Sequence, residues 1–198
     1  QLMNALKAYK KADLIQPDDF WTNRKMAMCY KLMGDAENAL KTYRHAQHIN
    51  PENLSVKLQV VNCLMELKKF NEALNELTQI QKEYPENTRV IRTLILSSFT
   101  AKNLAQAHYF TSLLLDTNEL KASDYMIAGH IGWCMDKHEE AKKNYNKALF
   151  MLENNWDLFV ELFKQHKELL IENEVDEQDI PLILDAMNYI SPSNTVLV

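Results

Sequence analysis

Glycine and proline are scarce in this chain. Its 198 residues include three glycines and five prolines. Folds built on β-hairpins or phosphate-binding loops use glycine in their turns, so this scarcity favours helices joined by short turns. The hydrophobic share of 46% is typical of a protein that buries a core, which argues against intrinsic disorder.

The chain also lacks an excess of positive charge. It has 22 Lys and Arg residues against 27 Asp and Glu, which gives a formal net charge of −5. General nucleic-acid binders depend on a cationic surface for their affinity. No nucleic-acid partner is therefore expected.

Cysteine and histidine form no pattern typical of a metal site. The three cysteines, Cys29, Cys63 and Cys134, are widely separated and include no CxxC pair. We interpret them as small buried hydrophobic residues, which suits a reducing, cytoplasmic location. His45 and His48 lie three residues apart on a predicted helix, but no third ligand lies nearby in the sequence. Neither a metal nor another cofactor is predicted.

Long apolar runs and catalytic motifs are missing too. No apolar run reaches the roughly 18 residues of a membrane-spanning helix, so no membrane span is expected. The sequence contains no HExxH, GxSxG, Walker or GxGxxG string, and the chain is predicted not to be an enzyme. It begins at Gln1, part-way through the repeat described next, so we expect a segment of a longer chain. A signal peptide could precede such a segment.

An internal repeat of 34 residues is the main positive feature. Alanines recur at this spacing, and a mostly larger residue follows each alanine at the fourth position and a mostly small or aliphatic one at the seventh. These offsets place the three side chains on one helical face, where small residues let a neighbouring helix approach. Prolines at 17, 51 and 85 then end the first three helices. The three positions are Ala5, Ala39, Ala73, Ala107 and Ala141; Tyr9, Tyr43, Leu77, Thr111 and Tyr145; and Ala12, Ala46, Ile80, Leu114 and Ala148.

Each repeat also has an upstream helix, predicted to begin 19 residues before its alanine. This predicts starts at Phe20, Leu54, Thr88 and Ala122, with short polar turns between the two helices. The pattern weakens in residues 88–121, where Ser98 and Thr111 occupy positions usually held by large residues. Beyond residue 155 two further apolar helical patterns, at 155–173 and 180–190, are typical of a cap that covers the last repeat.

In length and in its marked small and large positions, this pattern resembles the tetratricopeptide repeat family. The resemblance implies an all-α fold, a right-handed α-α superhelix or solenoid with a C-terminal helical cap. The half-unit 1–19 would be followed by units 20–53, 54–87, 88–121 and 122–155, then by capping helices at 156–190 and a tail at 191–198.

The resemblance further implies that the chain is a scaffold or adaptor that binds a protein or peptide partner in a concave groove lined by the first helix of each unit. Position by position, we expect four cations and no carboxylate there, which would favour acidic peptides with apolar residues. The predicted peptide-binding residues are Trp21, Arg24, Lys25, Met28, Leu58, Gln59, Asn62, Arg89, Arg92, Leu96, Met126 and His130.

Several alternatives remain open from the sequence. The predicted groove cations could simply be solvated, and its apolar residues could belong to the core. A clamp for a C-terminal carboxylate matches only in part, because Met28 and Thr93 replace the asparagine and arginine that the family uses. The segment could also be a structural spacer, self-associate through residues 1–15, or recruit substrate for a larger enzyme. An RNA-binding helical repeat is a further alternative, although such repeats are usually basic.

Overall fold

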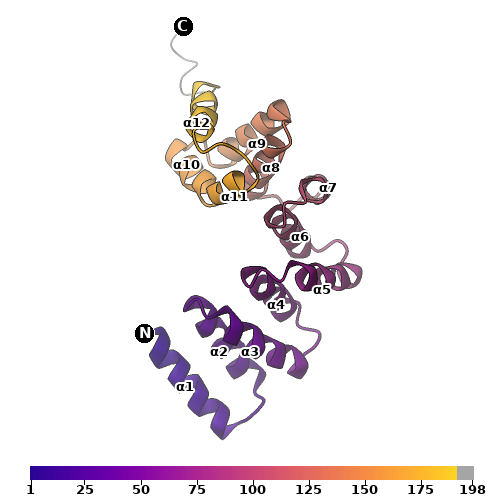
Figure 1. The fold of residues 1–198 in the computed structure, drawn as a ribbon, viewed down its shortest axis with the longest axis vertical. Coiled ribbons are helices and arrows are strands. Elements are labelled where there is room, and N and C mark those ends of the chain that lie inside the picture. The colour runs from indigo at the N-terminus through magenta and orange to yellow at the C-terminus, as the bar shows by residue number, and fades with distance from the viewer. Residues whose placement is uncertain (191–198) are drawn as a thin grey trace. The chain divides into compact units, whose positions relative to one another are not determined.

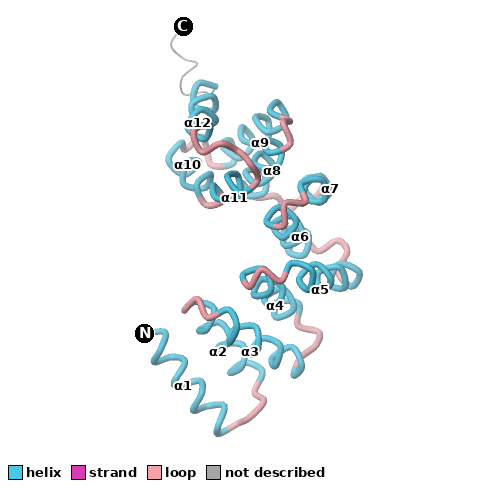
Figure 2. The backbone as a smooth tube through the Cα atoms, viewed as in Figure 1, coloured by secondary structure: helices cyan, strands magenta, loops and turns pink. Residues whose placement is uncertain are grey.

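The computed structural model describes residues 1–190, so the predicted tail at 191–198 lies outside the described residues. The described part contains twelve α-helices and no strand, which confirms the all-α prediction (Figures 1 and 2). The chain divides into two compact units, the first formed by Gln1–Pro85 and the second beginning at Glu86.

The first unit contains five helices in antiparallel hairpins. Two of them begin at the predicted residues Phe20 and Leu54, because the polar residue before each accepts a hydrogen bond from the open backbone at the helix start. Asp19 accepts from the Thr22 N–H at 2.7 Å, and Asn53 accepts from the Val56 N–H at 3.1 Å. The helices are α1 (Leu2–Ile15), α2 (Phe20–Leu32), α3 (Ala36–Ile49), α4 (Leu54–Glu66) and α5 (Phe70–Glu83).

The second unit contains two further hairpins and the three helices that follow them. The hairpins are α6 (Thr88–Thr100) with α7 (Leu104–Leu115), and α8 (Ala122–Cys134) with α9 (His138–Met151). The capping helices are α10 (Trp156–Lys164), α11 (Lys167–Glu172) and α12 (Asp179–Ile190).

The face predicted from the repeat is buried in both units. Ala39, Tyr43 and Ala46 are at most 3% exposed, and the corresponding residues of α5, α7 and α9 are buried as well. In α1, by contrast, only Leu6 is buried, while Leu14 and Ile15 are 83% and 85% exposed. Self-association through residues 1–15 stays a prediction.

The polar residues in the weakest repeat are buried without losing their hydrogen bonds. The Ser98 hydroxyl donates to Gln106 Oε1 at 3.2 Å, and the Thr111 hydroxyl donates to the Ala107 carbonyl at 2.8 Å. Burial of a hydroxyl costs little once it has a partner, so this repeat keeps the hairpin of its neighbours.

The turn inside each hairpin has a residue in the left-handed backbone region. Gly34, Lys68, Lys102 and Asp136 have φ angles of 77°, 57°, 59° and 58°, and they recur at the same 34-residue spacing. Glycine adopts this conformation freely, whereas a residue with a Cβ atom pays about 1 kcal/mol for it.

The capping helices complete the core of the second unit. Phe159, Phe163 and Leu170 are fully buried in one cluster with Tyr145 and Met187. The sequence predicted a single helix over 155–173, but the helix breaks at Gln165 and His166 into α10 and α11.

Candidate protein-interaction surface

A cleft of about 620 Å³ lies in the first unit, mainly between α2 and α4. The 34-residue period brings equivalent residues of successive first helices next to each other, so Arg24 and Lys25 of α2 share the cleft with Gln59 of α4. Four predicted groove residues are thus brought together. The full lining is Arg24, Lys25, Met28, Lys31, Leu32, Gly34, Tyr43, Ser55, Gln59 and Glu66.

Positive charge predominates in this cleft, although it does contain a carboxylate. Lys31 Nζ lies 2.9 Å from Gln59 Oε1 and 3.5 Å from a carboxylate oxygen of Glu66. The expectation of a groove free of acids is therefore wrong. Arg24 and Lys25 form no ion pair within residues 1–190, so two uncompensated cations remain.

Large apolar side chains are exposed along the same helix. Trp21, Met28 and Leu32 are 60%, 48% and 58% exposed, and their spacing of seven and four residues places them on one face of α2. The Arg24 guanidinium lies 5.5 Å from the centre of the Trp21 ring. Leu32 was missed in the sequence, where continuing the helical spacing one turn beyond Met28 would have found it.

Two predicted groove residues of α4 lie elsewhere. Leu58 is 5% exposed and belongs to the core, so its predicted contact with a peptide is wrong. Asn62 is half-buried and does not line the cleft. The accessible surface of the first unit therefore consists mainly of residues from α2.

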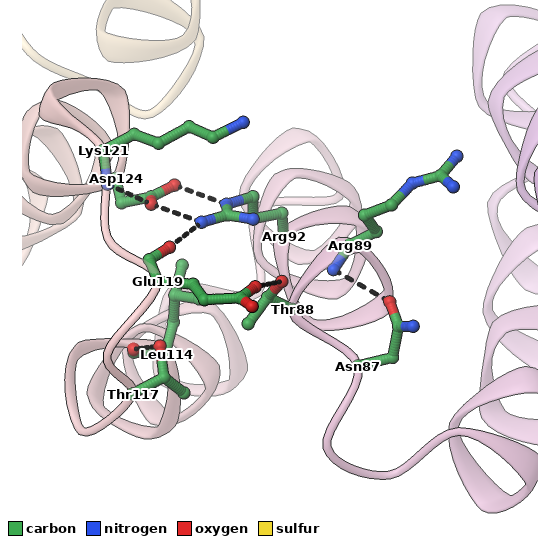
Figure 3. Close-up of polar contacts among 9 residues, drawn as sticks. All are labelled: Asn87, Thr88, Arg89, Arg92, Leu114, Thr117, Glu119, Lys121 and Asp124. Atoms are coloured by element: carbon green, nitrogen blue, oxygen red, sulfur yellow. Dashed lines mark hydrogen bonds and ion pairs between the residues drawn. The ribbon is translucent and has the colours of Figure 1, made fainter.

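In the second unit, Arg92 is held by an internal ion pair, contrary to its predicted role. Its Nε and Nη2 atoms each lie 2.8 Å from an oxygen of Asp124, and Nη2 also donates to the Glu119 carbonyl at 2.5 Å (Figure 3). The hydrogen bonds that Arg92 donates to Asp124, which is 6% exposed, raise the pKa of Arg92. Asp124 Oδ2 also accepts from the Lys121 N–H at 2.9 Å. Arg92 therefore ties α6 to the start of α8.

The neighbouring cation, Arg89, is exposed and points away from this ion pair (Figure 3). Leu96 is 40% exposed and lines a small cleft of about 150 Å³ together with Arg92, Ile127 and His166. Of the predicted groove residues in the second unit, Arg89 and Leu96 are thus the two that are exposed.

Met126 and His130 are completely buried, which corrects their predicted contact with a peptide. His130 Nε2 donates to the Phe163 carbonyl at 3.3 Å, so Nδ1 accepts from the Tyr145 hydroxyl at 2.8 Å. The Phe163 carbonyl lies in the last turn of α10, where carbonyls have no partner within the helix. Burial lowers the pKa of His130 to about 3, so the ring is neutral at physiological pH.

Within residues 1–190 no three His, Cys, Asp or Glu side chains are grouped as metal ligands would be. His45, one of the two histidines considered above, has its Nε2 atom 2.8 Å from Asp18 Oδ1. None of the described helices is long and apolar enough to cross a membrane.

Comparison with known proteins gives matches for both sequence and fold. A tetratricopeptide repeat model matches residues 31–95. No curated protein matches the chain by sequence.

Solved structures resemble the chain at low identity, which shows the fold alone. A MamA structure, residues 41 to the end, from Desulfovibrio magneticus RS-1 has a TM-score of 0.68 at 16% identity, covering 78% of this chain and 87% of that one. A tetratricopeptide repeat protein from Parabacteroides merdae ATCC 43184 has a TM-score of 0.67 at 16% identity, covering 98% and 70%. YrrB, described as a TPR protein with an unusual peptide-binding site, has a TM-score of 0.62 at 17% identity, covering 84% of each chain.

These similarities agree with what the residues themselves show. The 34-residue period and the paired helices agree with the family match, which identifies tetratricopeptide repeats over residues 31–95.

Proposed function

We propose that the first unit binds an acidic segment of a partner protein that also carries apolar side chains. Tetratricopeptide repeat proteins act as scaffolds for protein–protein interaction. The binding surface would be the first-unit cleft together with the exposed face of α2, which we call the α2 surface: Trp21, Arg24, Lys25, Met28, Leu32 and Gln59.

One observation carries this proposal. Arg24 and Lys25 have no ionic partner within the described residues, and they lie on the same helix as three exposed large apolar side chains. Carboxylates on a partner would supply the missing charges, and partner apolar side chains would cover Trp21 and Met28. Burial of apolar surface contributes about 25 cal/mol per Å², while charge complementarity chiefly sets specificity and association rate.

Fluorescence polarisation with a labelled peptide of Glu-Glu-Leu repeats tests the proposal. We expect saturable binding to the full chain that weakens as salt rises, because salt screens exposed charges. The variant Arg24→Glu/Lys25→Glu should reduce affinity by about ten-fold or more.

The matched control variant is Lys41→Glu/Lys82→Glu. These lysines are exposed on α3 and α5 of the same unit, and their replacement changes the net charge equally. Equal loss of affinity in both variants would show that the net charge is responsible, and it would refute a specific role for the α2 surface. Absence of peptide binding to the unmodified chain would refute the proposal as well.

A further inference from the structure

A second and larger cleft, of about 700 Å³, lies in the second unit, and we call it the cap cleft. It lies between the α6–α7 turn, the α8–α9 turn and the segment that joins α11 to α12. It is therefore distinct from the faces of the first helices that form a repeat groove. Its lining is Lys102, Leu104, Trp133, Cys134, Asp136, His138, Asn173, Glu174, Val175, Asp176, Asp179 and Leu182.

Apolar side chains form part of the cap cleft. Trp133 is half-buried, and the His138 ring packs on it with 4.4 Å between ring centres. Leu104 and Val175 are also half-buried, whereas Leu182 is 63% exposed. An aliphatic side chain of a partner would find apolar contacts there.

The charge of the cap cleft is strongly negative. Four carboxylates line it, and Lys102 is the one Lys or Arg in the lining. None of the four forms an ion pair with Lys or Arg within residues 1–190. Asp136 lies 3.8 Å from His138 Nε2, and Asp176 Oδ1 accepts from the Gln178 N–H at 2.9 Å.

Asn173 adds an acceptor that is independent of these carboxylates. It is only 7% exposed, and its Nδ2 atom donates to the Phe99 carbonyl at 3.2 Å and to the Leu169 carbonyl at 2.8 Å. Both amide hydrogens are thus used, while Oδ1 has no hydrogen bond within the described residues. This leaves an acceptor without a protein partner, on a residue that lines the cleft, which a donor could satisfy.

We propose that the cap cleft binds a basic segment of a partner protein. Lysine and arginine side chains carry hydrogen-bond donors and positive charge but no acceptors, which complements four carboxylates without a Lys or Arg partner and the Asn173 oxygen. An aliphatic side chain of the same segment packs against Trp133 and Leu182. Nucleic acid is a poor occupant, because its phosphates would be repelled.

This site has a polarity opposite to that of the α2 surface, which has two unpaired cations. The two surfaces therefore select different segments, and the chain can hold an acidic and a basic partner segment at different places. The cap cleft is lined by residues of the second unit alone, so this proposal does not depend on the proposed function of the first unit.

A labelled peptide of Lys-Lys-Leu repeats tests the proposal on the full chain. We expect saturable binding that is lost as salt rises and that falls by about ten-fold or more in Glu174→Lys/Asp176→Lys. Leu182→Ser, a change at an exposed position, should weaken binding without affecting the fold, which circular dichroism would check.

The matched control is Glu153→Lys/Glu161→Lys, which makes the same change in net charge at exposed residues of the second unit outside the cleft. No binding to the unmodified chain, or an equal loss in both double variants, would overturn the proposal. Binding of the Glu-Glu-Leu peptide should be undiminished by the Glu174→Lys/Asp176→Lys change. Failure of one peptide to bind therefore refutes one site without bearing on the other.

Discussion

Replacing Gly129 by alanine would insert a methyl group where the Tyr145 ring already lies. A Cβ atom at residue 129 would overlap Cδ1 and Cε1 of that ring and lie 2.8 Å from its Cζ. The ring cannot easily move away, because it is fully buried, its hydroxyl is bonded to His130, and Phe159 and Phe163 pack around it.

The change in the free energy of unfolding combines one stabilising and two destabilising contributions. Alanine in place of glycine favours a helix by about 1 kcal/mol. Overpacking a core costs about 1–3 kcal/mol. Displacement of the tyrosine would also strain or break its bond to His130, and an unpaired buried polar atom costs about 1–3 kcal/mol. We therefore expect Gly129→Ala to destabilise the second unit by about 1–5 kcal/mol.

The same helix provides the matched control. At Gly132 a Cβ atom would lie 3.4 Å from the Cβ and N atoms of Ala141, which is close to an ordinary contact. Gly132→Ala should therefore be near neutral, or stabilising by up to about 1 kcal/mol through helix propensity. The same Gly→Ala change is therefore expected to lower the stability of the second unit at residue 129 but not at residue 132.

Urea unfolding followed by tryptophan fluorescence would measure both variants. Trp21→Phe as the background removes the tryptophan of the first unit, so Trp133 and Trp156 report on the second. If Gly129→Ala were as stable as the parent, or if both alanine variants lost the same stability, the inferred contact between residue 129 and Tyr145 would be wrong.

Two further predictions concern pH and backbone conformation. The pKa of His130 is lowered to about 3 in the folded chain, whereas an unfolded histidine has a pKa of about 6.5. Between these two pH values the unfolded chain binds one more proton than the folded chain. The free energy of unfolding contributed by His130 is therefore fully present above pH ~6.5 and decreases as the pH falls toward 3, by about 2 kcal/mol at pH 5. Urea titrations at pH 7 and 5 should show this loss in the parent but a smaller one in His130→Gln, and an equal loss would contradict the assignment. Gly34 has a φ of 77° and open space around its missing Cβ, so Gly34→Ala should cost about 1 kcal/mol through conformation alone. Lys68 has a φ of 57°, so Lys68→Gly should leave the melting temperature unchanged or raise it. A larger drop in melting temperature for Lys68→Gly than for Gly34→Ala would refute the reasoning.

The helices and their buried faces could be predicted because their signals are local. The offsets of four and seven residues after Ala39 define one helical face, and Asn53 both follows a proline and caps the next helix. The left-handed turn residues could also have been found, since Lys68 lies one 34-residue period after Gly34. Each of these features depends on a few neighbouring residues, whose hydrogen bonds and periodicity are visible in the sequence.

The surface was predicted less well, because exposure depends on what packs against a residue from elsewhere in the chain. The repeat pattern places Arg92 and His130 on first helices, but it does not show that Asp124 pairs with the arginine from 32 residues away. Nor does it show that α10 supplies the Phe163 carbonyl to the histidine, 33 residues away. The cap cleft likewise arises where the segment after α11 meets two turns of the repeats. A periodic pattern specifies the face of the helix on which a side chain lies. Packing against distant segments decides whether that face contacts solvent, the core or a partner.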